Sequence, residues 1–143
     1  MTDFGYIRPE HWNAGMIENS FIYYPEKLML GKPSDLGMDY QDVYFSTEDG
    51  LRLNGWFVPG NKDITWLWFP GNAGNISYRL ENLYLLTSKL GINVLIFDYR
   101  GYGNSQGKVS EEGTYLDAQA ALSYLHSRRD INPAHIVFFG RSS

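Results

Sequence analysis

The chain has 143 residues, of which 43% are hydrophobic and 20% charged, a balance typical of a globular domain rather than a disordered segment. Its formal net charge is −4, and its lysines and arginines are scattered, which argues against a nucleic-acid-binding surface. The absence of cysteine excludes disulfides and cysteine-bound zinc, and we predict no metal and no cofactor.

The first 35 residues show no regular hydrophobic period and contain Pro9, Pro25 and Pro33. We therefore predict an irregular lead-in over residues 1–35 and a domain over residues 36–143. Charged side chains interrupt the first twenty positions, which is not the pattern of a signal peptide. No segment approaches the ~20 consecutive apolar residues of a membrane-spanning helix, so we expect a cytoplasmic protein.

Two segments of alternating apolar and polar residues come next, at about 42–47 and 51–58. The Asp49-Gly50 pair lies between them and suits the positive backbone angles of a tight hairpin turn. The sequence therefore predicts two antiparallel strands.

Three short apolar runs follow, and each is typical of a strand that is buried on both faces. They are Ile64–Phe69, Val94–Phe97 and Ile136–Phe139. Alternation of such strands with helices predicts an α/β fold with a mixed, mostly parallel sheet, a leading antiparallel hairpin and helices on both faces.

Two helices are predicted between these strands. The first covers about residues 76–90, with Asn75 as its N-cap and Gly91 just past its end. The second covers about residues 110–129, with Ser110 as its N-cap. We expect its inner face to consist of Tyr115, Ala118, Leu122 and Leu125.

Three loops follow the carboxyl ends of the buried strands, where open α/β sheets bind their ligands. They are residues 70–75, 98–107 and 140–143. The last reads Gly140-Arg141-Ser142-Ser143 and matches the start of a G-x-S-x-G nucleophile elbow, in which a sharp turn exposes a serine. A serine that caps a following helix fits the same residues equally well.

The other two loops are rich in glycine. In residues 70–75, backbone N–H groups are suited to bind a developing oxyanion, although an ordinary connection capped by Asn75 fits as well. In residues 98–107, we expect Asp98 and Arg100 to form a charged pair that shapes the site. The glycine spacing there is G-x-G-x-x-x-G, which departs from the dinucleotide-binding G-x-G-x-x-G and disfavours nucleotide binding.

These motifs together resemble the α/β-hydrolase superfamily. The residues that carry the resemblance are F-P-G-N-A-G-N, F-D-Y-R-G-Y-G-N-S-Q-G and G-R-S-S, together with the stretch from Tyr24-Pro25 to Trp56. More narrowly, the chain resembles the serine aminopeptidase-like and membrane-associated esterase branch, which includes protein depalmitoylases. The resemblance covers roughly residues 21–143.

The resemblance implies that Ser142 is a nucleophile that attacks an ester, thioester or amide carbonyl of a small-molecule or acylated substrate. It further implies that the backbone N–H groups of Asn72, or alternatively Ala73, and of Ser143 bind the oxyanion. Water then releases the acyl group.

The chain departs from the family pattern at its end. The family places an acid and then a histidine after the serine, whereas this sequence ends at Ser143. Its histidines are His11, His126 and His135, and we expect each to be a surface residue rather than a base. We therefore expect the N-terminal part of an α/β-hydrolase fold, truncated after the nucleophile strand and inactive by itself.

Two further expectations concern the last strand and the membrane anchor. The alternative to a truncated hydrolase is a non-catalytic fragment or split half that pairs with another polypeptide through the open edge of the last strand. The hydrophobic anchor common in the membrane-associated branch is missing from the sequence, so membrane association is expected only of a complete protein.

Overall fold

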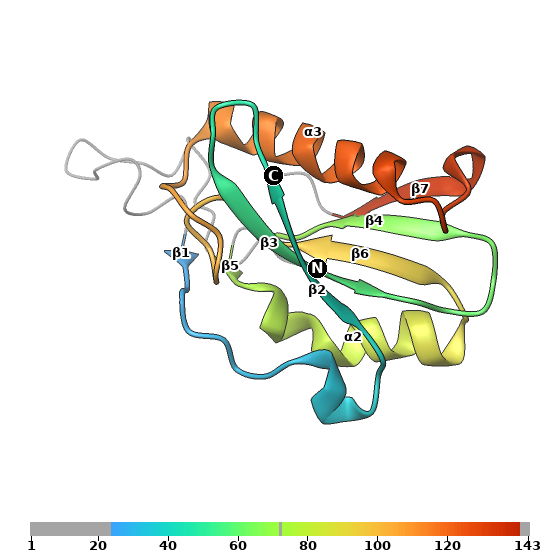
Figure 1. Ribbon diagram of the computed structural model, residues 1–143. Helices are drawn as coiled ribbons and strands as arrows, with labels where there is room; N and C mark the ends of the chain where they lie inside the picture. The colour runs from blue at the N-terminus through green and yellow to red at the C-terminus, as the bar shows by residue number, and fades with distance from the viewer. Residues whose placement is uncertain (1–23, 72, 141–143) are drawn as a thin grey trace, which may run out of the picture.

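The computed structural model describes residues 24–71 and 73–140 and is built around a five-stranded sheet (Figure 1). In the order β2-β3-β6-β4-β7, β3 is antiparallel to both of its neighbours, whereas β4 is parallel to both β6 and β7. The predicted mixed sheet with a leading hairpin is therefore confirmed. The strands are β2 (Gln41–Ser46), β3 (Arg52–Val58), β4 (Thr65–Phe69), β6 (Asn93–Phe97) and β7 (Ile136–Gly140).

The hairpin turn is wider than predicted. Gly50 alone of the Asp49-Gly50 pair has a positive φ, of 91°. The N–H of Thr47 donates to the Leu51 carbonyl, and the N–H of Gly50 donates to the Thr47 carbonyl. Residues 47–51 therefore form the connection, and Asp49 keeps an ordinary backbone conformation while its side chain faces Arg100.

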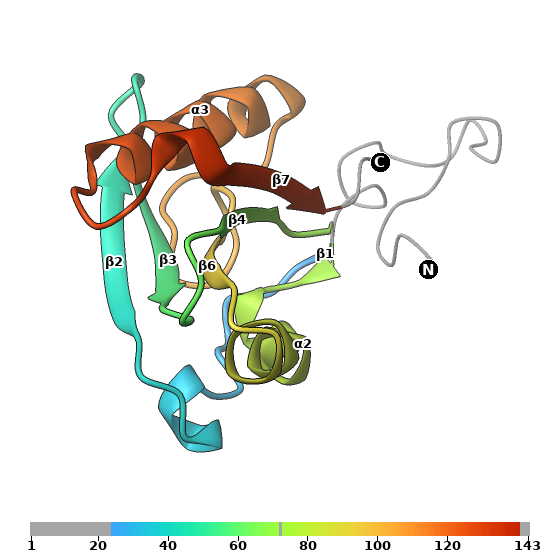
Figure 2. The ribbon, with the colours of Figure 1, turned by 90° about the vertical axis from the view of Figure 1, so that its right-hand side faces the viewer.

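Helices cover both faces of the sheet, as predicted (Figure 2). On one face, η3 (Ile76–Arg79), α2 (Leu80–Tyr84) and the π-helical η4 (Leu85–Lys89) follow one another without a break. On the other face lies α3 (Glu111–Ser127). The short elements are β1 (Tyr24–Pro25), β5 (Ala73–Gly74), η2 (Pro33–Leu36) and η5 (Pro133–His135), and β1 pairs in parallel with β5.

The predicted helix ends are confirmed. The side chain of Asn75 accepts a hydrogen bond from the N–H of Ser77, and that of Ser110 accepts one from Gly113. Gly91 follows the first helical segment with a φ of 76°, a conformation that glycine adopts without strain.

Side chains that alternate along the strands form two apolar clusters, one on each face of the sheet. On the α3 face they include Leu53, Phe57, Leu67, Leu95 and Phe97, which pack with Ala121 and Leu125. On the α2 face they include Trp56, Val58, Trp68, Val94 and Ile96, which pack with Ile76 and Leu83.

The inner face of α3 differs from the prediction. Tyr115 is 72% exposed, whereas Leu125 is buried as expected. The helix is rotated because Asp117 points inward to Arg100, whose side chain also packs on Gly113. The buried residues are Gly113, Asp117, Ala120, Ala121 and Leu125, and Ala118 and Leu122 are half-buried.

Among the described residues, strand β7 has the open outer edge that was expected of the last strand, but its faces are not buried as its apolar run predicted. It lies at the edge of the sheet, and β4 is its one strand neighbour among the described residues. Phe138 is 60% exposed, and Val137 and Phe139 are exposed too. The run of apolar residues identified a strand correctly, but it did not predict the exposure of these side chains.

The helices of the structure bear on the prediction that no segment crosses a membrane. Within residues 24–71 and 73–140, no helix combines the length and apolar character that a membrane crossing needs. The division between lead-in and domain at residue 35 stays a prediction.

Candidate functional site

The carboxyl ends of β4, β6 and β7 meet at one edge of the sheet, because the three strands are parallel and in register (Figure 1). Loops 70–75 and 98–107 leave the sheet at this edge, next to Gly140. The predicted nucleophile Ser142 and the predicted oxyanion donors Asn72 and Ser143 lie outside the described residues. Their roles therefore stay predictions.

Gly140 lies against the backbone of β4. A Cβ atom at this position would be 2.2 Å from the carbonyl oxygen of Phe69, with which Gly140 is paired in the sheet. Because that oxygen belongs to an inner strand, it cannot move aside. The glycine of the G-x-S motif is thus required by the close approach of two backbones.

Replacing Gly140 with alanine is expected to destabilise the protein by about 2–3 kcal/mol, from a clash with fixed backbone. Gly37→Ala is the matched control, since Gly37 has a φ of 80° but open space around its Cα. We expect about 1 kcal/mol for the control, from backbone strain alone. Urea unfolding measures both, and equal losses would contradict the role assigned to the clash.

Asn75 joins loop 70–75 to the N-terminal side of the domain. Its Oδ1 accepts hydrogen bonds from both the N–H and the hydroxyl of Ser77, and its Nδ2 donates to the carbonyls of Glu26 (3.1 Å) and Leu28 (2.8 Å). All the hydrogen-bonding groups of this buried amide are used. The sequence indicated the helix cap, but not the contact with residues 26–28.

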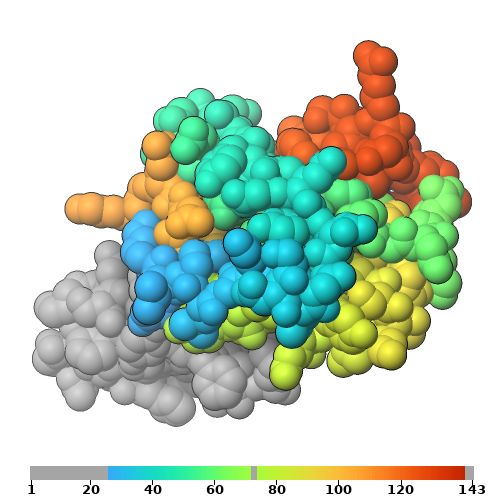
Figure 3. All heavy atoms as spheres, turned by 60° about the horizontal axis from the view of Figure 1, so that its bottom comes forward, coloured from blue at the N-terminus to red at the C-terminus, as the bar shows by residue number. Residues whose placement is uncertain are grey.

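Residues 26–32, which we call the strap, also contact loop 98–107. The N–H of Gly103 donates to the Glu26 carbonyl over 2.8 Å, and Lys27 Nζ donates to the Ser105 carbonyl over 3.1 Å. Figure 3 shows the strap at the surface, in blue, beside the hairpin and the first helical segment. The strap therefore connects the two glycine-rich loops of the candidate site.

Asp98 is buried directly after β6, with 1% of its surface exposed. Its Oδ1 accepts a hydrogen bond from the N–H of Ile76 over 2.9 Å, whereas Oδ2 has no hydrogen-bond partner among the described residues. Burial raises the pKa of Asp98 to about 8, although the Ile76 N–H and the charges of Arg79 and Lys27 oppose this rise.

The predicted pair of Asp98 and Arg100 does not form. The chain turns between Tyr99 and Tyr102, which directs the two side chains to different partners. Arg100 Nε donates to Asp117 over 3.0 Å, and its terminal nitrogens donate to Asp49 over 2.8 and 3.0 Å. The Arg100 guanidinium thus holds the hairpin turn and α3 together, and it lowers the pKa of Asp49 to about 2.

The described histidines lie away from the carboxyl ends of the strands, as predicted. His135 precedes β7, and its Nδ1 is 3.1 Å from an Oδ2 of Asp63 at the opposite edge of the sheet. His126 is exposed in the last turn of α3. His11 lies outside the described residues.

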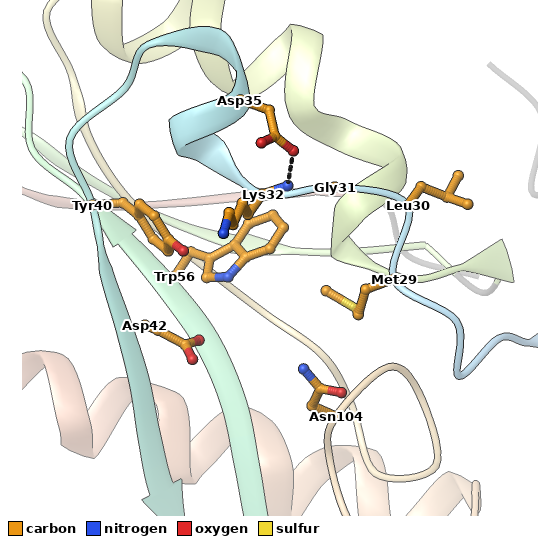
Figure 4. A pocket seen from close by; sticks show the side chains of 9 residues that line it. All are labelled: Met29, Leu30, Gly31, Lys32, Asp35, Tyr40, Asp42, Trp56 and Asn104. Carbon is orange, nitrogen blue, oxygen red and sulfur yellow. Dashed lines mark hydrogen bonds between the residues drawn. The ribbon is translucent and has the colours of Figure 1, made fainter.

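A groove of about 360 Å³ lies between the strap and the hairpin (Figure 4). Met29 and Trp56 supply apolar surface, and Asp42 supplies a carboxylate at the side of β2. The volume of the groove is in the range of small-ligand pockets, and no sequence pattern predicted this groove. The lining residues are Met29, Leu30, Gly31, Lys32, Asp35, Tyr40, Asp42, Trp56 and Asn104.

No family model matches the chain. Among curated proteins, it is 41% identical over 133 residues to the α/β hydrolase domain-containing protein WAV2 of Arabidopsis thaliana, covering 87% of this chain and 43% of that protein. It is 35% identical over 111 residues to an uncharacterized membrane protein of Saccharomyces cerevisiae, covering 77% of this chain and 39% of that protein. The chain thus spans less than half the length of these relatives.

Solved structures share the architecture. The Pyrococcus furiosus esterase Pf2001 superposes with a TM-score of 0.71 and 29% identity, over 84% of this chain and 46% of the esterase. An α/β hydrolase from Vibrio vulnificus gives a TM-score of 0.62 and 30% identity, over 73% of this chain and 36% of the hydrolase. The mixed sheet, the helices on both faces and the glycine-rich loops at its carboxyl edge are those of an α/β-hydrolase fold.

The relatives and the fold lead to the same family. The chain is similar in sequence to members of the α/β-hydrolase superfamily and has part of the α/β-hydrolase fold.

Proposed function

We propose that this chain carries the nucleophile, Ser142, of a serine hydrolase that cleaves ester, thioester or amide bonds. The observation that supports this most is the meeting of three parallel strand ends at one edge, where Gly140 is held against the Phe69 carbonyl. The proposal places Ser142, two residues after Gly140, at that edge, where α/β sheets bind their substrates.

The proposed reaction has two steps. The hydroxyl oxygen of Ser142 attacks the carbonyl carbon, and the backbone N–H groups of Ser143 and of Asn72 or Ala73 stabilise the oxyanion. The alcohol, thiol or amine leaves with a proton, and water then attacks the acyl-enzyme to release the acid and restore the serine. Both steps need a base, which an isolated hydroxyl lacks.

We assign the base and its acid partner to sequence beyond Ser143, in the order serine, acid, histidine. Reading the coding sequence past the codon for Ser143 tests this assignment. An in-frame glycine followed by an acid and a histidine supports it. A stop codon without a partner polypeptide would remove the claim that this chain takes part in catalysis.

Ser142→Ala in the complete gene product is expected to lower the hydrolysis of p-nitrophenyl esters about 10⁴-fold or more, because the attacking oxygen is lost. Labelling by a fluorophosphonate should disappear with it. Ser127→Ala is the matched control, since Ser127 Oγ only donates to the Tyr124 carbonyl at the far end of α3. Hydrolysis that survives in Ser142→Ala would refute the proposed nucleophile.

The substrate class and location belong to the same proposal. The resemblance to membrane-associated esterases, and a yeast relative named as a membrane protein, favour an acylated substrate close to a membrane surface. For the described part of the chain we propose a cytoplasmic location, with any membrane attachment made by other parts of the complete protein.

The exposed edge of β7 favours a second candidate function, a split half that pairs with another polypeptide. Within residues 24–71 and 73–140, no strand pairs with the outer edge of β7 beside Val137, Phe138 and Phe139, and such an edge can bind an added strand. A partner that carries the acid and the histidine would complete the hydrolase. Purification of such a complex separates this candidate from a single-chain enzyme.

We expect the isolated chain to self-associate at about 50 µM through this edge. Phe138→Lys should shift it toward the monomer, because the charge opposes close pairing of strands. Tyr115→Lys is the control, since Tyr115 is also an exposed aromatic residue (72% against 60% for Phe138) but lies on α3. Sedimentation velocity measures all three chains, and a monomeric wild type would count against the edge as an interface.

A further inference from the structure

Loop 70–75 is held at both of its ends. At its start, Phe69 pairs with Gly140 in the sheet. At its end, the N–H of Ile76 donates to Asp98 Oδ1 over 2.9 Å. Of the backbone groups proposed to bind the oxyanion, that of Ala73 lies between these two fixed points, so the position of Ile76 limits its placement.

Asp98 itself is held on three sides. Its N–H donates to the Asn54 carbonyl over 2.9 Å, and its own carbonyl accepts from Ser105 Oγ over 2.7 Å. On the third side its Oδ2 lies against Gly103, where a Cβ atom would be only 2.2 Å away. The carboxyl group therefore has a fixed orientation toward loop 70–75.

A contact that only stabilised the fold would not need a carboxyl group here. The Ile76 N–H requires a single acceptor, and the second oxygen of Asp98 is buried without a hydrogen-bond partner among the described residues. Burial of such a group is unfavourable, and proteins keep such groups mainly where function requires them.

We propose that Asp98 is a positioning residue of the hydrolase, which sets the oxyanion-binding backbone of loop 70–75 through its hydrogen bond with Ile76. The inference rests on the proposed function, because it assigns Asp98 a role in that reaction. Asp98 does not touch the substrate. It acts through the geometry of the loop, and any acceptor of the same shape can replace it.

The test compares Asp98→Leu with Asp98→Asn in the complete gene product. Leucine fills the space but accepts no hydrogen bond, so kcat for a p-nitrophenyl ester should fall about 10–100-fold, with KM changed less than about two-fold. Asparagine keeps an acceptor oxygen and should restore kcat to within about three-fold of wild type. Asp63→Leu, at the opposite edge of the sheet, should leave kcat unchanged.

Amide hydrogen exchange of Ile76 supplies a readout that does not depend on activity. It should speed up in Asp98→Leu and return toward the wild-type rate in Asp98→Asn. Should the leucine variant not fold, Asp98→Ala takes its place. A wild-type kcat in the leucine variant, or an equal loss in the asparagine variant, overturns the inference.

Failure of the proposed function gives a different result. In that case the wild-type protein shows no hydrolysis that depends on Ser142, and the exchange of Ile76 alone decides whether Asp98 holds the loop. Unchanged exchange in Asp98→Leu would then overturn the inference, and faster exchange would support the structural half of it.

Discussion

Replacing Arg100 with methionine is expected to destabilise the protein by about 3–5 kcal/mol, because it leaves the carboxylate of Asp117 buried without its cation. Asp117 has no exposed surface, and it accepts hydrogen bonds from both the backbone N–H and Nε of Arg100. Burial raises the pKa of Asp117 while Arg100 opposes the rise. The loss is measured as the free energy of unfolding in urea.

Two controls separate the buried charge from other effects. Arg52→Met removes an exposed guanidinium that stacks on Tyr44 and should cost no more than about 0.5 kcal/mol. The double variant Arg100→Met/Asp117→Leu should recover much of the stability, because no unpaired buried charge is left. A double variant as unstable as Arg100→Met would show that packing, rather than charge, dominates the loss.

The free energy of unfolding is expected to fall as pH rises from about 4 to about 8, and Asp98 is the reason. Its pKa is about 8 in the folded protein and close to 3.8 in the unfolded chain, so the folded state binds one more proton within this window. Its contribution is fully present below pH 3.8 and is lost as pH rises toward 8. The slope from this one group is at most about 1.4 kcal/mol per pH unit.

Asp98→Asn should flatten this dependence, since an amide does not titrate. Urea unfolding at intervals between pH 5 and pH 8 measures the slope in both proteins, about 1.4 kcal/mol per unit at most for the wild type. Asp130→Asn is the control, because Arg128 lowers the pKa of Asp130 and its titration lies below the window. A wild-type slope retained in Asp98→Asn would show that another group titrates.

Local patterns in the sequence were sufficient to predict the elements and the family. Asn75, Ser110 and Gly91 mark helix ends in the structure because capping depends on a few neighbouring residues. The glycine of the G-x-S motif was also identified from local sequence, and its backbone lies against the Phe69 carbonyl.

The failures concern contacts between residues far apart in sequence. Arg100 was expected to pair with its near neighbour Asp98, but its partners are Asp49 and Asp117. The ion pair of Arg100 with Asp117 also sets the rotation of α3. Tyr115 is therefore exposed, although the spacing of apolar residues predicted that it faces inward. Charged residues that face inward are invisible to hydrophobic periodicity, and a partner in the tertiary structure is needed to identify them.

The exposure of the side chains of β7 was also beyond local patterns. Val137 to Phe139 have the composition of an inner strand, but composition does not report which strands flank them. The role of the strap was missed for a similar reason, since its contacts with Asn75 and Gly103 are made largely by backbone groups.

The strand order has a consequence for synthesis on the ribosome. Strand β4 precedes β6 in the chain, yet β6 lies between β4 and the hairpin. A nascent chain that ends near residue 70 can therefore form the hairpin, but its β4 segment has no neighbouring strand yet. The tryptophans of β4 are then exposed and available to chaperones. Strand β6 can pair with both β3 and β4 only after it has left the exit tunnel. We therefore expect the sheet to form late and cooperatively rather than strand by strand.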